Sequence, residues 1–300
     1  MTGSKIGWLG TGEMGARIVR RLAEQGYGVV AWNRTRSRAA VLEDVGVTIV
    51  ESPRDVAQAA SVTFAMLTDA QAVREVLIGA DGVIEGLQPG SIIVDMSTIA
   101  PEAARAIAAE VAAAGGTMLA CPVSGGIGAV ATGDLSLMVS GDRAAVDAVT
   151  PILGAIGKRV AYMGDGEQAL IMKIAINLSL AVQMLAFSEG VLLAELNGIS
   201  RADAVDAMLN SAITSPMLRH RGPAVLPGAL PDPAWFNCRM MQKDLLLALE
   251  LARASSLPMP TTSLLNEWMS ACRGSGEGDE DFSVVFHVLA GLAGVGDKGG

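Results

Sequence analysis

The sequence predicts an α/β protein in which a doubly wound parallel sheet is followed by an all-helical domain, with one long helix joining the two. In the first half, short apolar runs alternate with longer amphipathic segments, which is the pattern of βαβ units. From about residue 165 onward, only helix-length periodicity remains. We therefore expect two domains, residues 1–164 and 165–300, with a long helix over about 167–196 and a flexible tail at about 294–300.

The first domain contains runs that are apolar enough to be buried on both faces of a sheet. Strands are expected at 5–10, 29–33, 61–67, 91–95, 116–120 and 135–140, with helices such as 13–25 and 101–114 between them. Because crossovers between parallel strands are right-handed, these elements should form a sheet that is covered by helices on both faces.

The second domain begins with a segment, 168–196, whose only charges are Lys173, Glu189 and Glu195. A helix that is apolar on most of its faces should be buried in a core, between domains or between subunits. Five prolines between 216 and 233 predict a loop-rich passage. Further helices are expected at 201–209, 240–253, 262–272 and 282–292.

The composition excludes several classes of protein. Of 300 residues, 51% are hydrophobic and 18% are charged, and the formal net charge is -9. The longest uncharged apolar stretch, 174–188, is shorter than the roughly 20 residues of a membrane-spanning helix. An acidic chain gains little from phosphate backbones, and three cysteines and two histidines match no metal-binding spacing. With no signal peptide visible, we expect a cytoplasmic protein without a metal, nucleic acid or membrane partner.

The strand at 5–10 leads directly into a G-x-G-x-x-G motif, Gly10-Thr11-Gly12-Glu13-Met14-Gly15. The first glycine permits a tight turn, the second lets the backbone approach a pyrophosphate, and the third lets the helix pack against the strand. A glycine turn without a ligand is the alternative. The position between a strand and a helix of a βαβ unit favours a dinucleotide site of the Rossmann type, with Gly10, Thr11, Gly12, Glu13 and Met14 as cofactor-binding residues.

The end of the second strand indicates which dinucleotide is bound. NAD-binding chains place an acidic residue there, whereas this chain has Asn33-Arg34-Thr35, followed by Arg36 and Arg38. A guanidinium can pair with a 2′-phosphate. We therefore expect NADP (NADPH), with NAD as the weaker alternative if Arg34 is only a surface charge.

Six ordered motifs along nearly the whole chain resemble the β-hydroxyacid dehydrogenases, which include 3-hydroxyisobutyrate dehydrogenase and, closer in appearance, the glyoxylate/succinic semialdehyde reductases. They are the segments 6–15, 66–69, 94–98 and 122–126, the pair Lys173 and Asn177, and the segment 243–245. The resemblance implies hydride transfer between NADPH and a small aldehyde or keto acid, or a 3-hydroxy acid, of the 3-hydroxyisobutyrate, succinic semialdehyde or glyoxylate type.

The resemblance also implies roles for individual residues. Lys173 and Asn177 match the catalytic pair, and Met66 and Leu67 match a strand end along the cofactor. Thr98 and Lys243 would meet cofactor and substrate, and the remaining substrate residues would be Ser124, Gly125, Gly126, Phe236 and Asp244. The chain departs from the family at Ala120-Cys121, Glu167, Ala169 and Ile176, which are often Asp-Ala, two glycines and a second Asn.

Lys173 has a chemical interpretation of its own. It is the only cation between Arg159 and Arg201, in a segment expected to be buried, and Asn177 lies one helical turn away on the same face. A lysine that extends its stem along the surface to reach water is the alternative. A buried ammonium held by an amide oxygen suits a general acid/base, which hydride transfer to a carbonyl requires.

Other interpretations remain open at this point. An imine reductase on the same fold and a non-catalytic NADPH-binding scaffold protein are the alternative functions, and relatives of both kinds often lack the lysine. Cys121 adjoins the substrate loop, where a small buried apolar filler is favoured over a reactive thiol. The apolar helix at 168–196 suggests a shared interface, so we expect a homodimer or a larger homo-oligomer.

Overall fold

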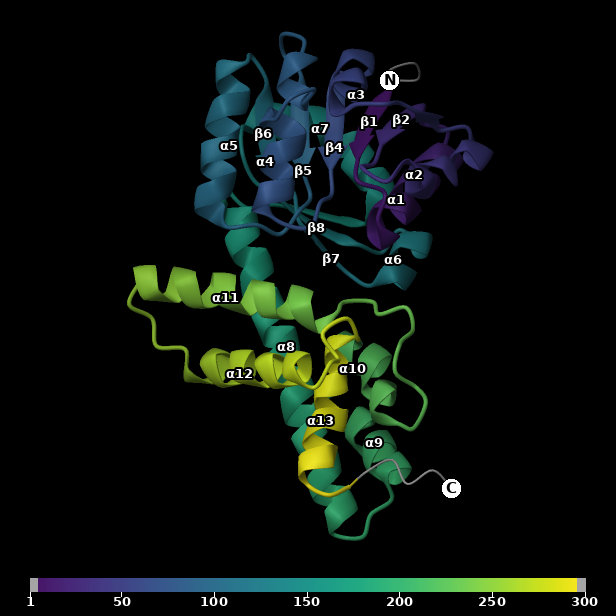
Figure 1. The fold of residues 1–300 in the computed structure, drawn as a ribbon, viewed down its shortest axis with the longest axis vertical. Helices are drawn as coiled ribbons and strands as arrows, with labels where there is room; N and C mark the ends of the chain where they lie inside the picture. The colour runs from purple at the N-terminus through teal and green to yellow at the C-terminus, as the bar shows by residue number, and fades with distance from the viewer. Residues whose placement is uncertain (1–4, 296–300) are drawn as a thin grey trace. The chain divides into compact units, whose positions relative to one another are not determined.

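Figure 1 shows the computed structural model of the chain, which describes residues 5–295. The chain divides into two compact units, the first ending at Lys173 and the second beginning at Ile174. The predicted boundary at residue 164 lies in the loop before helix α8 (Gln168–Leu196). The units divide within α8 because its residue Leu170 belongs to the hydrophobic core of the first unit.

The first unit is built on a six-stranded parallel sheet in the order β3-β2-β1-β4-β5-β6, which confirms the doubly wound prediction. Its strands run over Ile6–Leu9 (β1), Val29–Trp32 (β2), Thr48–Ile49 (β3), Val62–Ala65 (β4), Ile92–Asp95 (β5) and Thr117–Ala120 (β6). The strand order reverses between β1 and β4, so the carboxyl ends of these strands form the crevice where ligands bind in such sheets.

Each face of the sheet has its own core, because alternate side chains of a strand point to opposite faces. Trp8 and Phe64 stack at a centroid distance of 5.6 Å on the face covered by α1 and α7, whereas Leu9 and Ile93 face α3, α4 and α5. The helices of this unit are α1 (Glu13–Glu24), α2 (Arg36–Ala40), α3 (Pro53–Ala59), α4 (Ala70–Ile78), α5 (Pro101–Ala113), α6 (Ile127–Thr132) and α7 (Arg143–Ile156).

A second, three-stranded sheet follows the parallel one. It consists of β7 (Val123–Ser124), β8 (Ser136–Val139) and β9 (Arg159–Tyr162), with β7 antiparallel and β9 parallel to β8. The strand expected at 135–140 therefore does not join the six-stranded sheet, because its neighbours are β7 and β9. A single bridge between Ala120 and Ser140 connects it to the end of β6.

The second unit is helical, as predicted. It contains most of α8, then α9 (Arg201–Leu209), α10 (Pro216–Arg221), α11 (Cys238–Ala254), α12 (Pro260–Gly274) and α13 (Val285–Leu292). Helices α8 and α9 have the predicted bounds. Helix α10 was not expected in the proline-rich passage, but Ser215 caps it by accepting from the backbone N–H of Leu218 at 3.2 Å, and Pro216 occupies its first position.

The long helix α8 is less buried than the sequence suggests. Met184, Phe187 and Val191 lie in the core of the helical unit, whereas the side chains of Leu193 and Leu196 are 68% and 58% exposed. Among residues 5–295, α8 is also the helix that is long and apolar enough to cross a membrane by length and composition. Its buried polar residues, Asn177 and Ser188, are typical of a helix in a protein core.

Part of the predicted tail is ordered. The backbone N–H of Val295 donates to the carbonyl of Ala290 at 2.8 Å, and that of Gly294 to the carbonyl of Gly291 at 3.1 Å. Val295 packs against the core of the helical unit. These contacts close α13, and the rest of the predicted tail, 296–300, lies outside the described residues.

Candidate active site

The turn between β1 and α1 needs two of its glycines for internal reasons. Gly10 has a φ of +95°, and a Cβ atom there would lie 2.3 Å from the carbonyl oxygen of Met66. A Cβ atom at Gly15 would lie 2.3 Å from the carbonyl oxygen of Gly10. These two glycines therefore let the turn, the strand β4 and the helix α1 approach one another closely.

The packing of the turn does not explain Gly12 and Thr11. Among residues 5–295, a Cβ atom at Gly12 would meet nothing within 4 Å, and no side chain caps the first turn of α1. Thr11 is 3% exposed, and its Oγ1 is buried without a hydrogen-bond partner among the described residues. A bare helix N-terminus, an open space over a glycine and an unsatisfied hydroxyl together fit the pyrophosphate of a dinucleotide.

Asn33 holds this turn against the end of β2. Its Oδ1 accepts from the backbone N–H of Thr11 at 3.0 Å, and its Nδ2 donates to the carbonyl of Thr35 at 3.0 Å. Its side chain thus shapes the predicted cofactor site from within the protein. Thr35 lies at the N-cap of α2, where its side chain makes no capping bond.

The arginines after β2 are not equivalent. Arg36 pairs with Glu51 at 3.2 Å and with Glu43 at 3.9 Å. Arg34 is exposed, and across residues 5–295 it has no ion-pair partner. Arg38 lines a cavity of about 510 Å³ beside the glycine turn, whose other lining residues include Thr11, Gly12, Arg17 and Arg20. Of the other arginines there, Arg17 lies 3.6 Å from Glu13 and Arg20 lies 3.0 Å from Asp44. Arg34 and Arg38 make no ion pair among residues 5–295, which leaves them available to a phosphate near this turn.

Two neighbouring loops meet at the carboxyl ends of β4 and β5. The Oγ of Ser97 accepts from the backbone N–H of Leu67 at 2.9 Å, and the backbone N–H of Ser97 donates to the buried carboxylate of Asp95 at 3.0 Å. This places Met66, Leu67 and Thr98, all predicted from the sequence, in adjoining loops. Ser97 and Asp95 were not singled out, because nothing in their spacing shows that the two loops join.

In the predicted carboxylate loop, Ser124 ends β7, and Gly125 and Gly126 connect it to α6. Gly125 has a φ of +138°, and a Cβ atom there would lie 2.7 Å from Cδ2 of Leu135. The turn therefore requires glycine at position 125. Gly126 lies at the N-cap of α6, where no side chain of residues 5–295 makes a capping bond. Cys121, just before this loop, is fully buried, and burial together with the nearby Asp95 raises the pKa of its thiol.

Lys173 is the last residue of the first unit and is half-buried on α8. The turn of α8 before it is fixed to that unit through Leu170, which is fully buried in the core beside α4 and α5. At the entrance to α8, Glu167 forms a bidentate pair with Arg105 at 2.9 and 3.0 Å. The predicted proton donor thus belongs to the unit that carries the glycine turn.

Asn177, Lys243 and Asp244 form one cluster in the helical unit. The Nδ2 of Asn177 donates to Oδ2 of Asp244 at 2.5 Å, and Lys243 Nζ lies 2.9 Å from Oδ1 of Asp244. Asn177 and Asp244 are 2% and 1% exposed. This bond fixes the orientation of the Asn177 amide, with its oxygen turned away from Asp244.

Phe236 is positioned by a buried carboxylate that the sequence did not reveal. Asp281 is fully buried and accepts from the backbone N–H of Phe236 at 3.1 Å. It also binds the guanidinium of Arg221 through two bonds of 3.0 Å. Asp281 therefore fastens both ends of the segment that leads from α10 to α11. It lies 60 residues from Arg221 and 45 from Phe236, so no local sequence pattern indicates these contacts.

Comparisons with known proteins show the family to which the chain belongs. Residues 5–164 match the family described as the NAD binding domain of 6-phosphogluconate dehydrogenase. Residues 166–289 match the family described as NAD-binding of NADP-dependent 3-hydroxyisobutyrate dehydrogenase. Glyoxylate/succinic semialdehyde reductase 1 of Arabidopsis thaliana is 34% identical over 285 residues, which cover 95% of this chain and 98% of the relative.

Two solved structures share the whole fold. A 3-hydroxyisobutyrate dehydrogenase from Salmonella typhimurium has a TM-score of 0.87 at 29% identity, covering 94% of this chain and 99% of that one. Psf3, solved in complex with NADP+ and 2-OPP, has a TM-score of 0.86 at 28% identity, covering 95% and 99%.

Proposed function

Since the chain belongs to the β-hydroxyacid dehydrogenase family, we propose that it interconverts a small aldehyde or keto acid and the corresponding hydroxy acid with Lys173 as the general acid/base. It is an NAD(P)-dependent oxidoreductase that acts on CH–OH groups, and NADP(H) is its cofactor. The observation that carries the role of Lys173 is its place on α8, in the unit that holds the glycine turn.

The cofactor binds where the protein leaves room for its phosphates. The backbone N–H groups at the start of α1 and the hydroxyl of Thr11 would hold the pyrophosphate, and Gly12 leaves the space that it needs. Arg34, with Arg38 beside the cavity, would pair with the 2′-phosphate. When bound, NADPH supplies the hydride.

The protein supplies the proton and holds the substrate. In the reductive direction, the Lys173 ammonium donates its proton to the carbonyl oxygen and stabilises the negative charge that develops there. The amide nitrogen of Asn177 donates to Asp244, which leaves its amide oxygen as an acceptor. Asn177 lies one helical turn from Lys173 on α8, so this oxygen would accept from the Lys173 ammonium and hold it in place. The N–H groups of Gly125 and Gly126, with the hydroxyls of Ser124 and Thr98, would bind the substrate carboxylate.

The acid/base role is tested with Lys173→Ala, assayed with NADPH against glyoxylate, succinic semialdehyde and other short aldehyde acids. We expect kcat to fall by about 10³-fold, whereas the affinity for NADPH stays within about twofold. Added methylamine should restore part of the activity, because a small amine can take the place of the missing group. Lys158→Ala is the matched control, since Lys158 is an exposed lysine that pairs with Asp134.

Retention of wild-type turnover by Lys173→Ala would remove the acid/base assignment. Loss of NADPH binding in the same variant would instead assign Lys173 to the cofactor. Reduction of cyclic imines by the wild-type protein, at rates above those for the aldehyde acids, would favour the imine reductase. Absence of turnover with every substrate, while NADPH still binds, would favour the scaffold protein.

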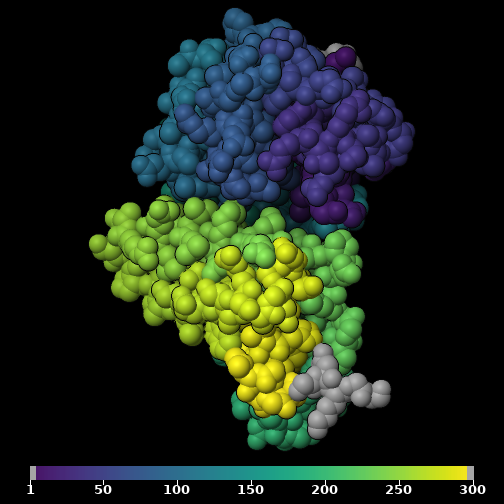
Figure 2. All heavy atoms as spheres, viewed as in Figure 1, coloured from purple at the N-terminus to yellow at the C-terminus, as the bar shows by residue number. Residues whose placement is uncertain are grey.

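We also propose that the protein is a cytoplasmic homo-oligomer. Its exposed apolar side chains on α8 include Leu193 and Leu196, and those on α11 and α12 include Leu246 and Leu264, which are 50% and 55% exposed. Atoms of helices α11 and α12, yellow-green in Figure 2, lie at the surface of the helical unit. Large exposed apolar side chains on adjoining helices favour a subunit interface. Light scattering coupled to size exclusion measures the subunit number directly.

A further inference from the structure

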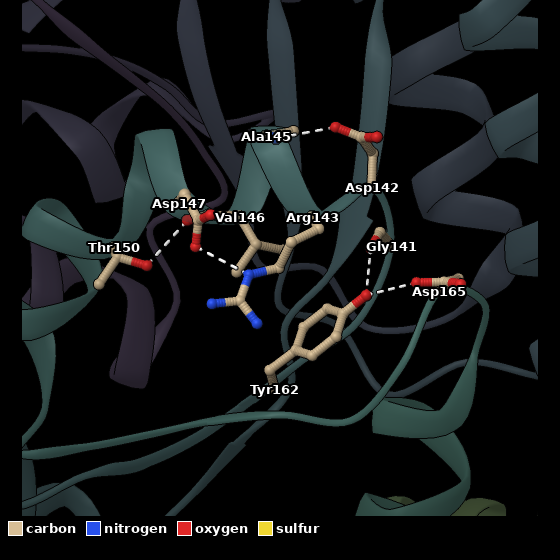
Figure 3. Close-up of polar contacts among 9 residues, drawn as sticks. All are labelled: Gly141, Asp142, Arg143, Ala145, Val146, Asp147, Thr150, Tyr162 and Asp165. Atoms are coloured by element: carbon tan, nitrogen blue, oxygen red, sulfur yellow. Dashed lines mark hydrogen bonds and ion pairs between the residues drawn. The ribbon is translucent and has the colours of Figure 1, made fainter.

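The turn that follows β8 is held from several sides, as Figure 3 shows. The hydroxyl of Tyr162 donates to the carbonyl of Gly141 at 3.2 Å, and it lies 2.5 Å from a carboxylate oxygen of Asp165. The backbone N–H of Gly141 donates to the carbonyl of Gly164 at 2.9 Å. Asp142 then caps α7 by accepting from the backbone N–H of Ala145 at 2.8 Å. The turn therefore has a well-defined position.

Ser140 precedes this turn and is fully buried. Its backbone N–H donates to the carbonyl of Ala120 at 2.9 Å, and its carbonyl accepts from the N–H of Ala120 at 3.1 Å. Ala120 is the last residue of β6, immediately before the segment that leads into Ser124. The main chain of Ser140 is thus fastened to the end of β6, four residues before the predicted carboxylate loop.

The side chain of Ser140 binds a different element. Its Oγ accepts from the backbone N–H of Ala169 at 3.2 Å, in a buried environment. Ala169 is the second residue of α8, so its N–H is one of the four at the start of a helix that no helical carbonyl can accept. Ser140 therefore supplies the partner for an otherwise orphaned donor at the entrance to α8.

Ala169 and Lys173 are one helical turn apart. In a regular α-helix the N–H of Lys173 bonds to the carbonyl of Ala169, so the two residues share one link of the helix. A displacement of the first turn of α8 would carry Lys173 with it. The position of the Lys173 backbone thus depends on where Ser140 holds Ala169.

We infer that Ser140 is a positioning residue for catalysis: it sets the place of Lys173 relative to the carboxylate loop, because its main chain holds the loop side and its side chain holds the helix. This inference rests on the proposed acid/base role of Lys173. Ser140 neither gives nor takes the transferred proton. It acts through the geometry of proton transfer, which is sensitive to displacements of about 1 Å.

The test uses Ser140→Ala in the full-length protein, with Ser188→Ala as the matched control. Ser188 is a residue of α8 and is also fully buried, and its Oγ donates to the carbonyl of Met184 at 2.8 Å. We expect Ser140→Ala to lower kcat by about tenfold and to raise the solvent deuterium isotope effect on kcat, because proton transfer becomes slower. The Kd for NADPH should stay within about twofold in both variants.

A second readout does not depend on activity. Hydrogen–deuterium exchange of a peptide covering residues 167–173 should become about tenfold faster in Ser140→Ala and should not change in Ser188→Ala. Tyr162→Phe keeps the ring and removes the hydroxyl that holds Gly141. It should lower kcat, raise the solvent isotope effect and speed the exchange of residues 167–173, each by a smaller factor than Ser140→Ala. This variant retains the test if Ser140→Ala folds poorly.

The inference is overturned if Ser140→Ala keeps the wild-type kcat and solvent isotope effect, or if both serine variants lose kcat equally. Either result leaves the proposed function intact as long as Lys173→Ala is inactive. If Lys173→Ala is fully active, the proposed function itself has failed, and the exchange result then describes only the anchoring of α8.

Discussion

The side-chain amide of Asn177 on α8 donates to the carboxylate of Asp244 on α11 at 2.5 Å, and both groups are almost completely buried. The same carboxylate pairs with Lys243 at 2.9 Å. A buried carboxylate needs such partners, because its desolvation would otherwise be costly. The pair therefore joins two helices of the second unit and at the same time turns the amide nitrogen of Asn177 toward Asp244.

The first prediction concerns this pair. Asn177→Ala and Asp244→Ala should each lower the free energy of unfolding by about 2 kcal/mol, since each leaves a buried polar partner unsatisfied. The double variant should lose about 1–2 kcal/mol less than the sum of the two, which a double-mutant cycle in urea measures. Strict additivity would contradict a direct interaction between them.

The second prediction compares two glycines of the same turn. Gly12→Ala should leave the free energy of unfolding within about 0.5 kcal/mol of wild type, because its Cβ atom would meet no atom of the described residues within 4 Å. It should weaken NADPH binding by more than about tenfold, since the methyl group occupies the space that we assign to the pyrophosphate. Gly15→Ala should instead destabilise the protein by about 1–3 kcal/mol through the close contact with the carbonyl of Gly10. Thermal unfolding without ligand and NADPH titration separate the two effects.

A third prediction follows from the unsatisfied hydroxyl of Thr11. Thr11→Val removes a buried polar atom that has no partner among the described residues, so the ligand-free protein should be as stable as wild type or up to about 1 kcal/mol more stable. Binding of NADPH should weaken by about five- to tenfold, because the hydroxyl would lose its bond to the cofactor. Unchanged affinity, measured by calorimetry, would show that the hydroxyl does not meet the cofactor.

The fourth prediction separates the arginines after β2. Arg34→Ala should lower the ratio of kcat/KM with NADPH to kcat/KM with NADH by about 10- to 100-fold, as expected for the loss of a charge-assisted hydrogen bond to the 2′-phosphate. Arg36→Ala should change this ratio by less than about threefold, because Arg36 already pairs with Glu51 and Glu43. An equal response of the two variants would contradict this division.

The fifth prediction concerns pH and the buried thiol of Cys121. Burial and Asp95 raise the pKa of this thiol in the folded state, so the folded protein keeps it protonated when an unfolded chain would ionise it. The stabilising effect is therefore complete below the unfolded value of about 8.5 and is lost as the pH rises above it, by about 1.4 kcal/mol per pH unit. In Cys121→Ala, the free energy of unfolding should therefore fall less steeply with pH above this value. In the native protein, Cys121 should resist alkylation by iodoacetamide at pH 8. Rapid labelling of Cys121 would contradict its burial.

Much of the fold follows from local patterns. The alternation of strands and helices, the glycine turn after β1, and the bounds of α8 and α9 were all predicted, because each depends on side-chain periodicity or on a stop signal nearby in the sequence. The sheet β7-β8-β9 was not predicted. Its strands are two to four residues long, and pairing of β8 with β9 rather than with β6 depends on which segments the folded chain brings together.

The candidate site divides in the same way. The sequence by itself determined the G-x-G-x-x-G turn and the four-residue spacing that places Lys173 and Asn177 on one face of a helix, since turn and helix geometry are local. The tertiary structure decided that Asn177 meets Asp244, 67 residues away, and that Ser140 meets Ala169, 29 residues away. Such bonds form only where burial of apolar side chains brings distant segments together and leaves their polar groups without water, so that each must find its partner in the protein.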